Sequence, residues 1–188
     1  MLYKDILFMT DDMEIKEGTL RLLTTGEIRL SRSVFGNSIK YNQVWVHCDS
    51  YFPFGLQNPK YAMAPNGELW FREELYRSDF SLASINEQHT FIHEMAHVWQ
   101  RYNGMWVRVR GLFSWAADYK YRLDGKKLLK DYSMEQQASI IADYWLLRQY
   151  GHRKWLDFTN RGVNFQGVSD ENIITMYEQV LSQFLEKR

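Results

Sequence analysis

The chain has 188 residues, of which 45% are apolar and 16% aromatic, and its 23 basic residues balance its 23 acidic ones. A neutral chain has no overall field to attract nucleic acid or an anionic membrane, and this one is apolar enough to bury a core. The single cysteine, Cys48, excludes an internal disulfide and a cysteine-rich zinc site. The length fits one domain, residues 1–188.

The N-terminus, Met1–Asp5, lacks the basic stretch and apolar run of a secretory signal. No segment approaches the roughly 20 apolar residues of a membrane span. We therefore expect a soluble protein that is made in the cytoplasm, and a route other than a signal peptide if it acts elsewhere.

The N-terminal part predicts a small amount of β-structure. Residues 24–26 (Thr-Thr-Gly) are expected to form a turn, and residues 31–35 a short helix that ends at Gly36. Residues 44–47 alternate β-branched and aromatic side chains, which predicts a strand.

Residues 61–71 carry a hairpin signal. Pro65-Asn66-Gly67 separates two short apolar stretches, residues 61–64 and 68–71, and Asn-Gly accepts positive φ at low cost. Residues 49–60 hold two of the three prolines and are expected to form a loop.

The central helix is predicted by a capping-box pattern, Ser84-x-x-Glu87, and should run to about Asn103, before Gly104. At 100° per residue its large apolar side chains share one face: Phe91, Ile92, Met95, Val98, Trp99 and Tyr102. His93 and His97 fall on the opposite face, which we expect to border a cleft.

His93-Glu94-Met95-Ala96-His97 is an H-E-x-x-H sequence. Histidines four residues apart on a helix lie one turn apart, so both rings can reach one Zn²⁺. Glu94 is then placed to take a proton from a metal-bound water. The alternative is that these residues form an ordinary solvated face.

The C-terminal half predicts further helices. Residues 105–110 fit a strand or extended loop, and residues 112–119 a short helix. Ser133-Met134-Glu135-Gln136 is a second capping-box pattern, opening a helix to about Tyr150. A last helix with a clean apolar stripe is expected from near Ser169.

A catalytic zinc site needs a third protein ligand. His89 is excluded because it lies about 12 Å from His97 along the helix axis, so we expect it to line the cleft or lie at the surface. His152 follows a Tyr-Gly helix end in a basic segment and is expected in a surface loop. Glu135 is the best candidate, because it shares a helical stripe with Ala138 and an unpaired carboxylate there would be costly.

Two alternatives accompany this choice. Glu135 could instead form a local salt bridge at a helix start. Asp143 could orient a histidine ring of the site or be an ordinary surface aspartate. An oxyanion donor is also expected, and the sequence does not choose among Tyr132, Tyr144 and His152.

H-E-x-x-H with a downstream helical glutamate resembles the gluzincin class of zinc peptidases. Several blocks are similar, more narrowly, to a zinc-metallopeptidase family tied to type VI secretion, whose members are fused to or encoded beside valine–glycine repeat spike proteins. These blocks are Gly26-Glu27, Val34-Phe35-Gly36, Pro65-Asn66-Gly67, the run His93-Glu94-Met95-Ala96-His97-Val98-Trp99-Gln100, and Glu135-Gln136-Gln137-Ala138.

This resemblance implies that His93, His97 and Glu135 bind zinc and that the fold is α+β, a mainly helical zincin-like domain with a small N-terminal β-sheet or hairpin and a central H-E-x-x-H helix. It implies a peptidase, with Glu94 as the base, acting on a protein or peptidoglycan peptide that lies along the edge of residues 68–71. It also implies an antibacterial effector with a type VI spike and a cognate immunity protein as partners. The alternatives are a non-catalytic zinc-bearing module that docks on a spike, and a housekeeping peptidase.

Overall fold

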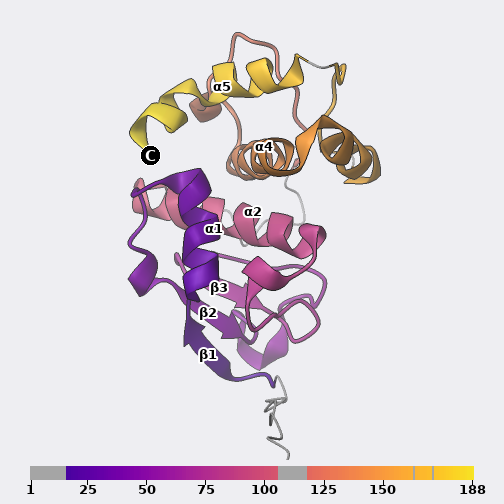
Figure 1. Ribbon diagram of the computed structural model, residues 1–188. Helices are drawn as coiled ribbons and strands as arrows, with labels where there is room; N and C mark the ends of the chain where they lie inside the picture. The colour runs from indigo at the N-terminus through magenta and orange to yellow at the C-terminus, as the bar shows by residue number, and fades with distance from the viewer. Residues whose placement is uncertain (1–15, 106–117, 163, 171) are drawn as a thin grey trace, which may run out of the picture.

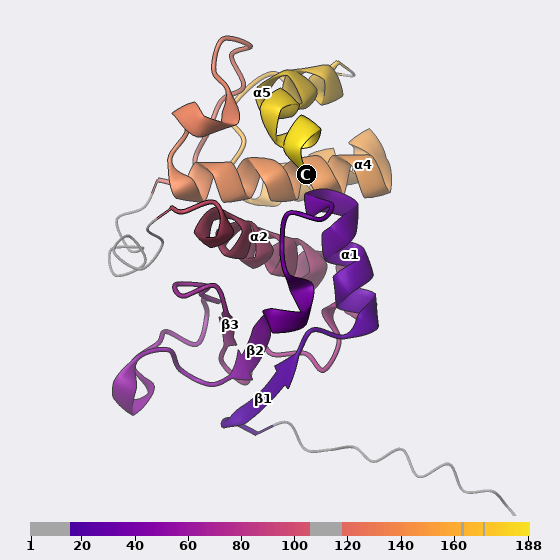
Figure 2. The same ribbon diagram turned by 90° about the vertical axis from the view of Figure 1, so that its left-hand side faces the viewer.

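The computed structural model describes residues 16–105, 118–162, 164–170 and 172–188, where a small three-stranded sheet is combined with helices. The sheet lies at one end of the molecule, with α2 (Ile85–Tyr102) between it and α4 (Met134–Gly162) (Figure 1). Helix α5 (Ile173–Lys187) covers the far side of α4, and the view of Figure 2 has the same order. The α+β class expected from the sequence is confirmed.

Strand β2 (Trp45–Cys48) is the centre of the sheet, which confirms the strand predicted at residues 44–47 to within one residue. It pairs antiparallel with β1 (Thr19–Leu22) and parallel with β3 (Leu69–Phe71). Phe71 continues the core toward α2, because the Phe71, Phe80 and Phe91 rings contact in series with centroids 4.5 and 5.2 Å apart.

The turn expected at residues 24–26 is wrong, because α1 (Thr25–Phe35) begins there. Thr24 is the N-cap, and its side chain and that of Glu27 each bond the other residue's backbone N–H, at 3.0 and 2.9 Å. The Thr-x-x-Glu pattern was thus a capping box rather than a turn. Helix α1 does end at Gly36, as expected.

The predicted hairpin is reduced to one bridge. Met63 and Trp70 exchange both backbone hydrogen bonds, at 3.0 and 2.8 Å, and Gly67 has φ 87° in the turn between them. The partner of β3 over its length is β2 instead. The edge that we expected to receive a peptide is therefore occupied at Trp70, because both of its backbone groups already bond to Met63.

Helix α2 begins and ends as predicted, with Ser84 and Glu87 completing a capping box. Its apolar face is buried against the sheet side, as expected for Phe91, Met95 and Val98. The histidine face is not an open cleft wall, however. His89, His97 and Gln100 are buried too, because α4 packs across this face.

Helix α4 is longer than the sequence predicted. It opens with the expected capping box between Ser133 and Gln136, but it resumes after a kink at Gly151, where φ is 80° and ψ is 170°. His152 therefore lies in a helical segment rather than a loop. Helix α5 begins four residues later than expected and buries the predicted stripe, including Tyr177 and Leu181.

Most of the strand or extended loop predicted at residues 105–110, and most of the helix predicted at 112–119, lie outside the described residues. Within the described part of the chain, none of the helices combines the length and apolar character needed to cross a membrane.

Candidate metal site

His93 and His97 of α2 meet Glu135 in the first turn of α4. The Oε2 atom of Glu135 lies 3.3 Å from Nε2 of His93 and 3.1 Å from Nε2 of His97. One ligand atom from each residue lies within 4.8 Å of the others. The structure thus brings together the three residues that were expected to hold the metal.

The spacing of these atoms fits a tetrahedral ion. With metal–ligand distances near 2.0–2.1 Å, two ligands of a tetrahedral Zn²⁺ lie roughly 3.3 Å apart. The two histidine–glutamate separations, 3.3 and 3.1 Å, match that edge length. Two imidazoles and one carboxylate are also a donor set that zinc prefers, with a fourth position left for water.

The charges of these groups depend strongly on one another. Burial alone would lower the pKa of His97, but the charge and hydrogen bond of Glu135 outweigh it and raise the pKa to about 9. Burial alone would raise the pKa of Glu135, but the two histidines hold it well below its usual range. The metal-free site therefore holds a proton on His97 where the ion would be.

Glu94 is buried beside this cluster, and its Oε2 atom has no hydrogen-bond partner among the described residues. Burial raises the pKa of Glu94, and the nearby His97 and His93 oppose the rise only in part. A buried carboxylate oxygen without a partner is costly, so this atom calls for a ligand or water in the site.

Gln100 fixes the ring of His97. Its Nε2 donates to the carbonyl of Met134 at 2.9 Å and to Oε1 of Gln137 at 3.2 Å. Its Oε1, 2.8 Å from Nδ1 of His97, must then be the acceptor. Nδ1 therefore carries a proton, and Nε2 faces Glu135 and the position of an ion.

The same contacts set the start of α4 against α2. Gln137 accepts from Gln100 and donates to the carbonyl of Tyr132 at 2.9 Å. Gln136 caps the helix and donates to the carbonyl of Lys120 at 2.6 Å. These two glutamines hold Glu135 in the turn that faces the histidines. The capping role of Gln136 was expected from the sequence, whereas the contacts of Gln137 were not.

Replacing Gln100 by Ala should lower zinc affinity about 10- to 100-fold, because hydrogen-bond partners of metal-binding histidines have effects of that size. The measurement is a competition titration with a chromogenic chelator. Gln88→Ala is the matched control, because Gln88 is a glutamine of the same helix that bonds Tyr150 instead of a histidine. Equal affinity of the Gln100→Ala variant and wild type would contradict this role.

Asp143 does not contact His93 or His97. It is buried and accepts from Nε2 of His89 at 2.7 Å and from the hydroxyl of Tyr121, which also contacts the hydroxyl of Tyr177. Asp143 is therefore not a surface aspartate, and the histidine ring that it orients is that of His89 rather than that of His93 or His97. His89 is likewise neither a cleft wall nor exposed, since it belongs to this buried polar network, which joins α2 to α4 and α5.

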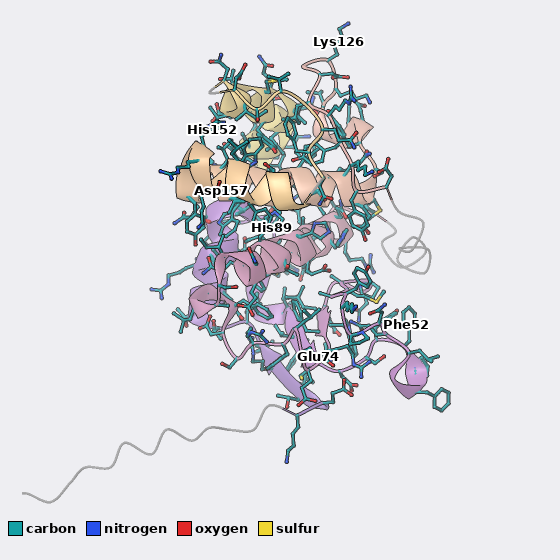
Figure 3. The ribbon with its side chains drawn as sticks, turned by 90° about the vertical axis from the view of Figure 1, so that its right-hand side faces the viewer. Phe52, Glu74, His89, Lys126, His152 and Asp157 are labelled. Carbon is teal, nitrogen blue, oxygen red and sulfur yellow. The ribbon has the colours of Figure 1, made fainter. Side chains whose placement is uncertain are left out.

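The three expected oxyanion donors contact other groups than the histidines of the site. The hydroxyl of Tyr132 donates to the carbonyl of Arg122, and that of Tyr144 to Glu178 on α5. His152 stacks on Trp155, beyond the kink and at the other end of α4 from Glu135 (Figure 3).

Tyr119 is the aromatic residue that sequence reasoning missed. Its ring centroid lies 6.1 Å from that of His93, and its hydroxyl has no hydrogen-bond partner in the described part of the chain. Burial raises the pKa of Tyr119, and the charges of Glu135 and Glu94 and the nearby Tyr61 raise it further. Tyr119 is therefore a neutral hydroxyl beside the site. Nothing in its local sequence distinguishes it, because the contact is long-range.

No known family model matches the sequence. The chain is 45% identical over 133 residues to the type VI secretion system spike protein VgrG2b of Pseudomonas aeruginosa. The match covers 67% of this chain and 13% of the spike protein, so the chain corresponds to a small part of that protein.

A solved structure, the effector domain of Pseudomonas aeruginosa VgrG2b, is similar over a larger share of both chains. The two are 38% identical with a TM-score of 0.63, and the match covers 85% of this chain and 89% of that domain. At this identity and coverage the similarity is one of sequence as well as of fold.

Proposed function

The chain belongs to the family of the type VI secretion effector domain of VgrG2b, and on that basis we propose that it is a zinc-dependent peptidase delivered as an effector. In this proposal His93, His97 and Glu135 hold the ion, and Glu94 is the base of an amide hydrolysis.

One observation carries the proposal: three ligand atoms within 4.8 Å of one another lie beside a buried carboxylate oxygen that has no partner among the described residues. A purely structural metal site has no need of an added base. Burying Glu94 without a partner costs stability, and a catalytic role explains why the chain bears that cost. This favours the enzyme over a zinc-bearing docking module.

Zinc, when bound here, would supply a water of lowered pKa and a Lewis acid for the substrate carbonyl. Glu94 accepts the proton of the attacking water at its free Oε2 atom and returns it to the leaving amine. Burial raises the pKa of Glu94, which favours uptake of the proton in the first of these transfers. Gln100 keeps Nε2 of His97 directed at the ion.

Tyr119 is the hydroxyl that we assign to the carbonyl oxygen of the substrate. Its raised pKa keeps it protonated, so it can donate a hydrogen bond as negative charge develops there. Replacing Tyr119 by Phe should lower kcat about 10²-fold with little change in KM or zinc content. Tyr102→Phe, on an exposed tyrosine at the end of α2, is the control. An unchanged kcat would remove Tyr119 from the mechanism.

We infer a zincin-like, gluzincin-type arrangement, in which one helix carries H-E-x-x-H beside a small sheet and a second helix supplies the glutamate. We also infer that residues 1–188 form one domain. The part of the spike protein to which the chain is related is a small share of that protein. We propose delivery by a type VI spike, which the same relation supports, and with it toxicity to a competitor and a cognate immunity protein. They are favoured over a housekeeping role because the chain's relative is a type VI spike protein.

The proposal is tested by measuring zinc content and amide hydrolysis on one preparation of the purified chain. We expect about one zinc per chain, since the described residues contain one set of three ligands. Cleavage should stop on chelation and return with zinc. The proposal would be contradicted if the chain retained no metal after incubation with excess zinc. It would also be contradicted if the zinc-loaded chain cleaved neither proteins nor peptidoglycan peptides.

A further inference from the structure

The loop of residues 50–61 exposes apolar side chains at an unusual density. Phe54 is 98% exposed, Leu56 73% and Tyr61 63%. We call these three residues the apolar tip. Single exposed apolar residues are ordinary on protein surfaces, but three from one short loop indicate a surface that contacts something else.

Phe54 is held in an unfavourable backbone conformation. Its φ is 59° and its ψ is 25°, which lie in the left-handed region. This region is sterically unfavourable for a bulky residue, and the exposed Phe54 ring gains no burial that would offset the cost. Among the described residues it is the only non-glycine with positive φ. Such outliers persist only when the surroundings determine them, and they gather at functional surfaces.

The surroundings do determine this loop. Nη1 of Arg72 donates to the carbonyls of Gly55 and Gln57, at 3.0 and 2.8 Å. The buried Gln57 side chain accepts from the N–H of Tyr51 and donates to the carbonyls of Tyr61 and Trp70. The loop is thereby fixed to β3, so a partner would meet a preorganised tip and lose little entropy in ordering it.

The apolar tip lies on the same side of the molecule as the candidate metal site (Figure 2). Its last residue, Tyr61, lies near enough to Tyr119 to act on it electrostatically, and Tyr119 faces His93. η2 (Pro53–Gly55), with Phe52 beside it, projects from the sheet on the side of the molecule where α4 begins (Figures 2 and 3). Glu135 belongs to the first turn of α4. A chain bound at the site can therefore extend over this loop.

We propose that the apolar tip binds apolar side chains of an extended protein substrate, away from the bond that is cleaved. This proposal rests on the proposed peptidase function and selects its substrate class. Residues 50–61 contain no acidic residue and one basic residue, Lys60, so the tip matches an apolar polypeptide. A peptidoglycan peptide, which is short and rich in carboxylates, offers it little.

A lipid surface fits less well, because carboxylates lie at the base of the loop. Arg72, which clamps the loop, is paired with Glu17, and the exposed Glu73 and Glu74 follow it in the chain. Anionic lipids would be repelled by this group. A membrane is therefore an outcome to be excluded by the test.

The test compares wild type with a Phe54→Ser/Leu56→Ser variant on casein, an unfolded protein, and on a short peptide that spans only a bond cleaved in casein. KM for casein should rise about 10-fold in the variant, because apolar burial is lost. Its kcat, its activity on the short peptide and its zinc content should be unchanged. Leu82→Ser is the matched control, because Leu82 is 84% exposed on another element, η3 (Phe80–Leu82).

Binding is measured as well, so that failure of the proposed function can be told apart from failure of this inference. In a Glu94→Gln background, the Phe54→Ser/Leu56→Ser substitutions should lower the affinity for casein about 10-fold. This result is expected whether or not the wild type hydrolyses casein. Equal casein binding and KM would overturn the inference. So would an equal loss on the short peptide, cleavage of peptidoglycan peptides alone, or tip-dependent binding of phosphatidylglycerol vesicles in place of casein.

Discussion

Glu94→Gln should retain zinc and lose amide hydrolysis by about 10⁴-fold, the upper end of what a positioned base contributes. We expect the upper end because Glu94 serves two proton transfers, one from the attacking water and one to the leaving amine. The substitution keeps the size and the hydrogen-bonding capacity of the side chain. It removes the negative charge and the ability to take a proton, at a position where Oε2 has no partner among the described residues.

The measurement is kcat/KM on a protein substrate together with zinc content on the same sample. Glu74→Gln, which neutralises an exposed carboxylate in the segment that follows β3, is the control for charge (Figure 3). Loss of zinc from the Glu94→Gln variant would mean that Glu94 belongs to the coordination of the ion rather than to proton transfer. Full activity with zinc bound would remove its role as the base.

Elements whose signals are local could be predicted from the sequence. Ser84 and Glu87 fix the start of α2 through contacts within one turn, and Ser133 and Gln136 do the same for α4. The capping box of Thr24 was equally local but was read as a turn, because Gly26 follows it. Position 26 of α1 requires a glycine because η3 approaches the helix there. A Cβ atom on residue 26 would lie 2.0 Å from Oγ of Ser81.

Elements that depend on distant partners could not be predicted. Asn66-Gly67 predicts a hairpin, but β3 pairs with β2 over its whole length. Only an isolated bridge between Trp70 and Met63 forms on the hairpin side of β3. The parallel pairing has no local signature, because it joins residues more than 20 positions apart. The continuation of α4 after Gly151 could not be predicted either, because the Tyr-Gly pair by itself signals the end of a helix. The helix resumes because the side chain of Trp155 is fully buried, and its packing stabilises the second segment.

The residues of the candidate site also fall into two groups, those with local signals in the sequence and those that depend on distant partners. His93 and His97 share a helix, so their spacing alone places them on one face, and Glu135 could be selected because a buried stripe makes its charge costly. Gln100 could have been suspected from its place on the histidine face. Asp143 and Tyr119 depend on how other segments cross α2, and their true partners, His89 and His93, could not be read from the chain.

Glu135→Gln should lower zinc affinity by more than the roughly 100-fold upper limit for residues that only support a ligand. An amide is a poor zinc ligand, and the substitution removes the one negative charge among the three ligands. Activity should fall with zinc occupancy. Asp157→Asn, on an exposed carboxylate of the same helix, is the control. Unchanged zinc affinity in the Glu135→Gln variant would show that the third ligand is another group.

The same variant should change how stability depends on pH in the metal-free protein. The folded-state pKa of His97 is raised from 6.5 to about 9, so its protonated form contributes stability that is fully present below pH 6.5 and is lost as the pH rises through about 9. Removing the Glu135 charge removes most of that contribution. In chelator, the stability difference between wild type and Glu135→Gln should therefore be larger at pH 6 than at pH 9.5, as thermal unfolding would measure.

Zinc binding by wild type should show the opposite trend, because the ion must displace the proton on His97 and so binds more tightly as the pH rises toward 9. Two measurements with opposite pH dependence then come from one pair of residues. If chelated wild type and Glu135→Gln differed in stability by the same amount at both pH values, the carboxylate would not pair with a charged His97. The steep pH dependence of zinc affinity should then be absent as well.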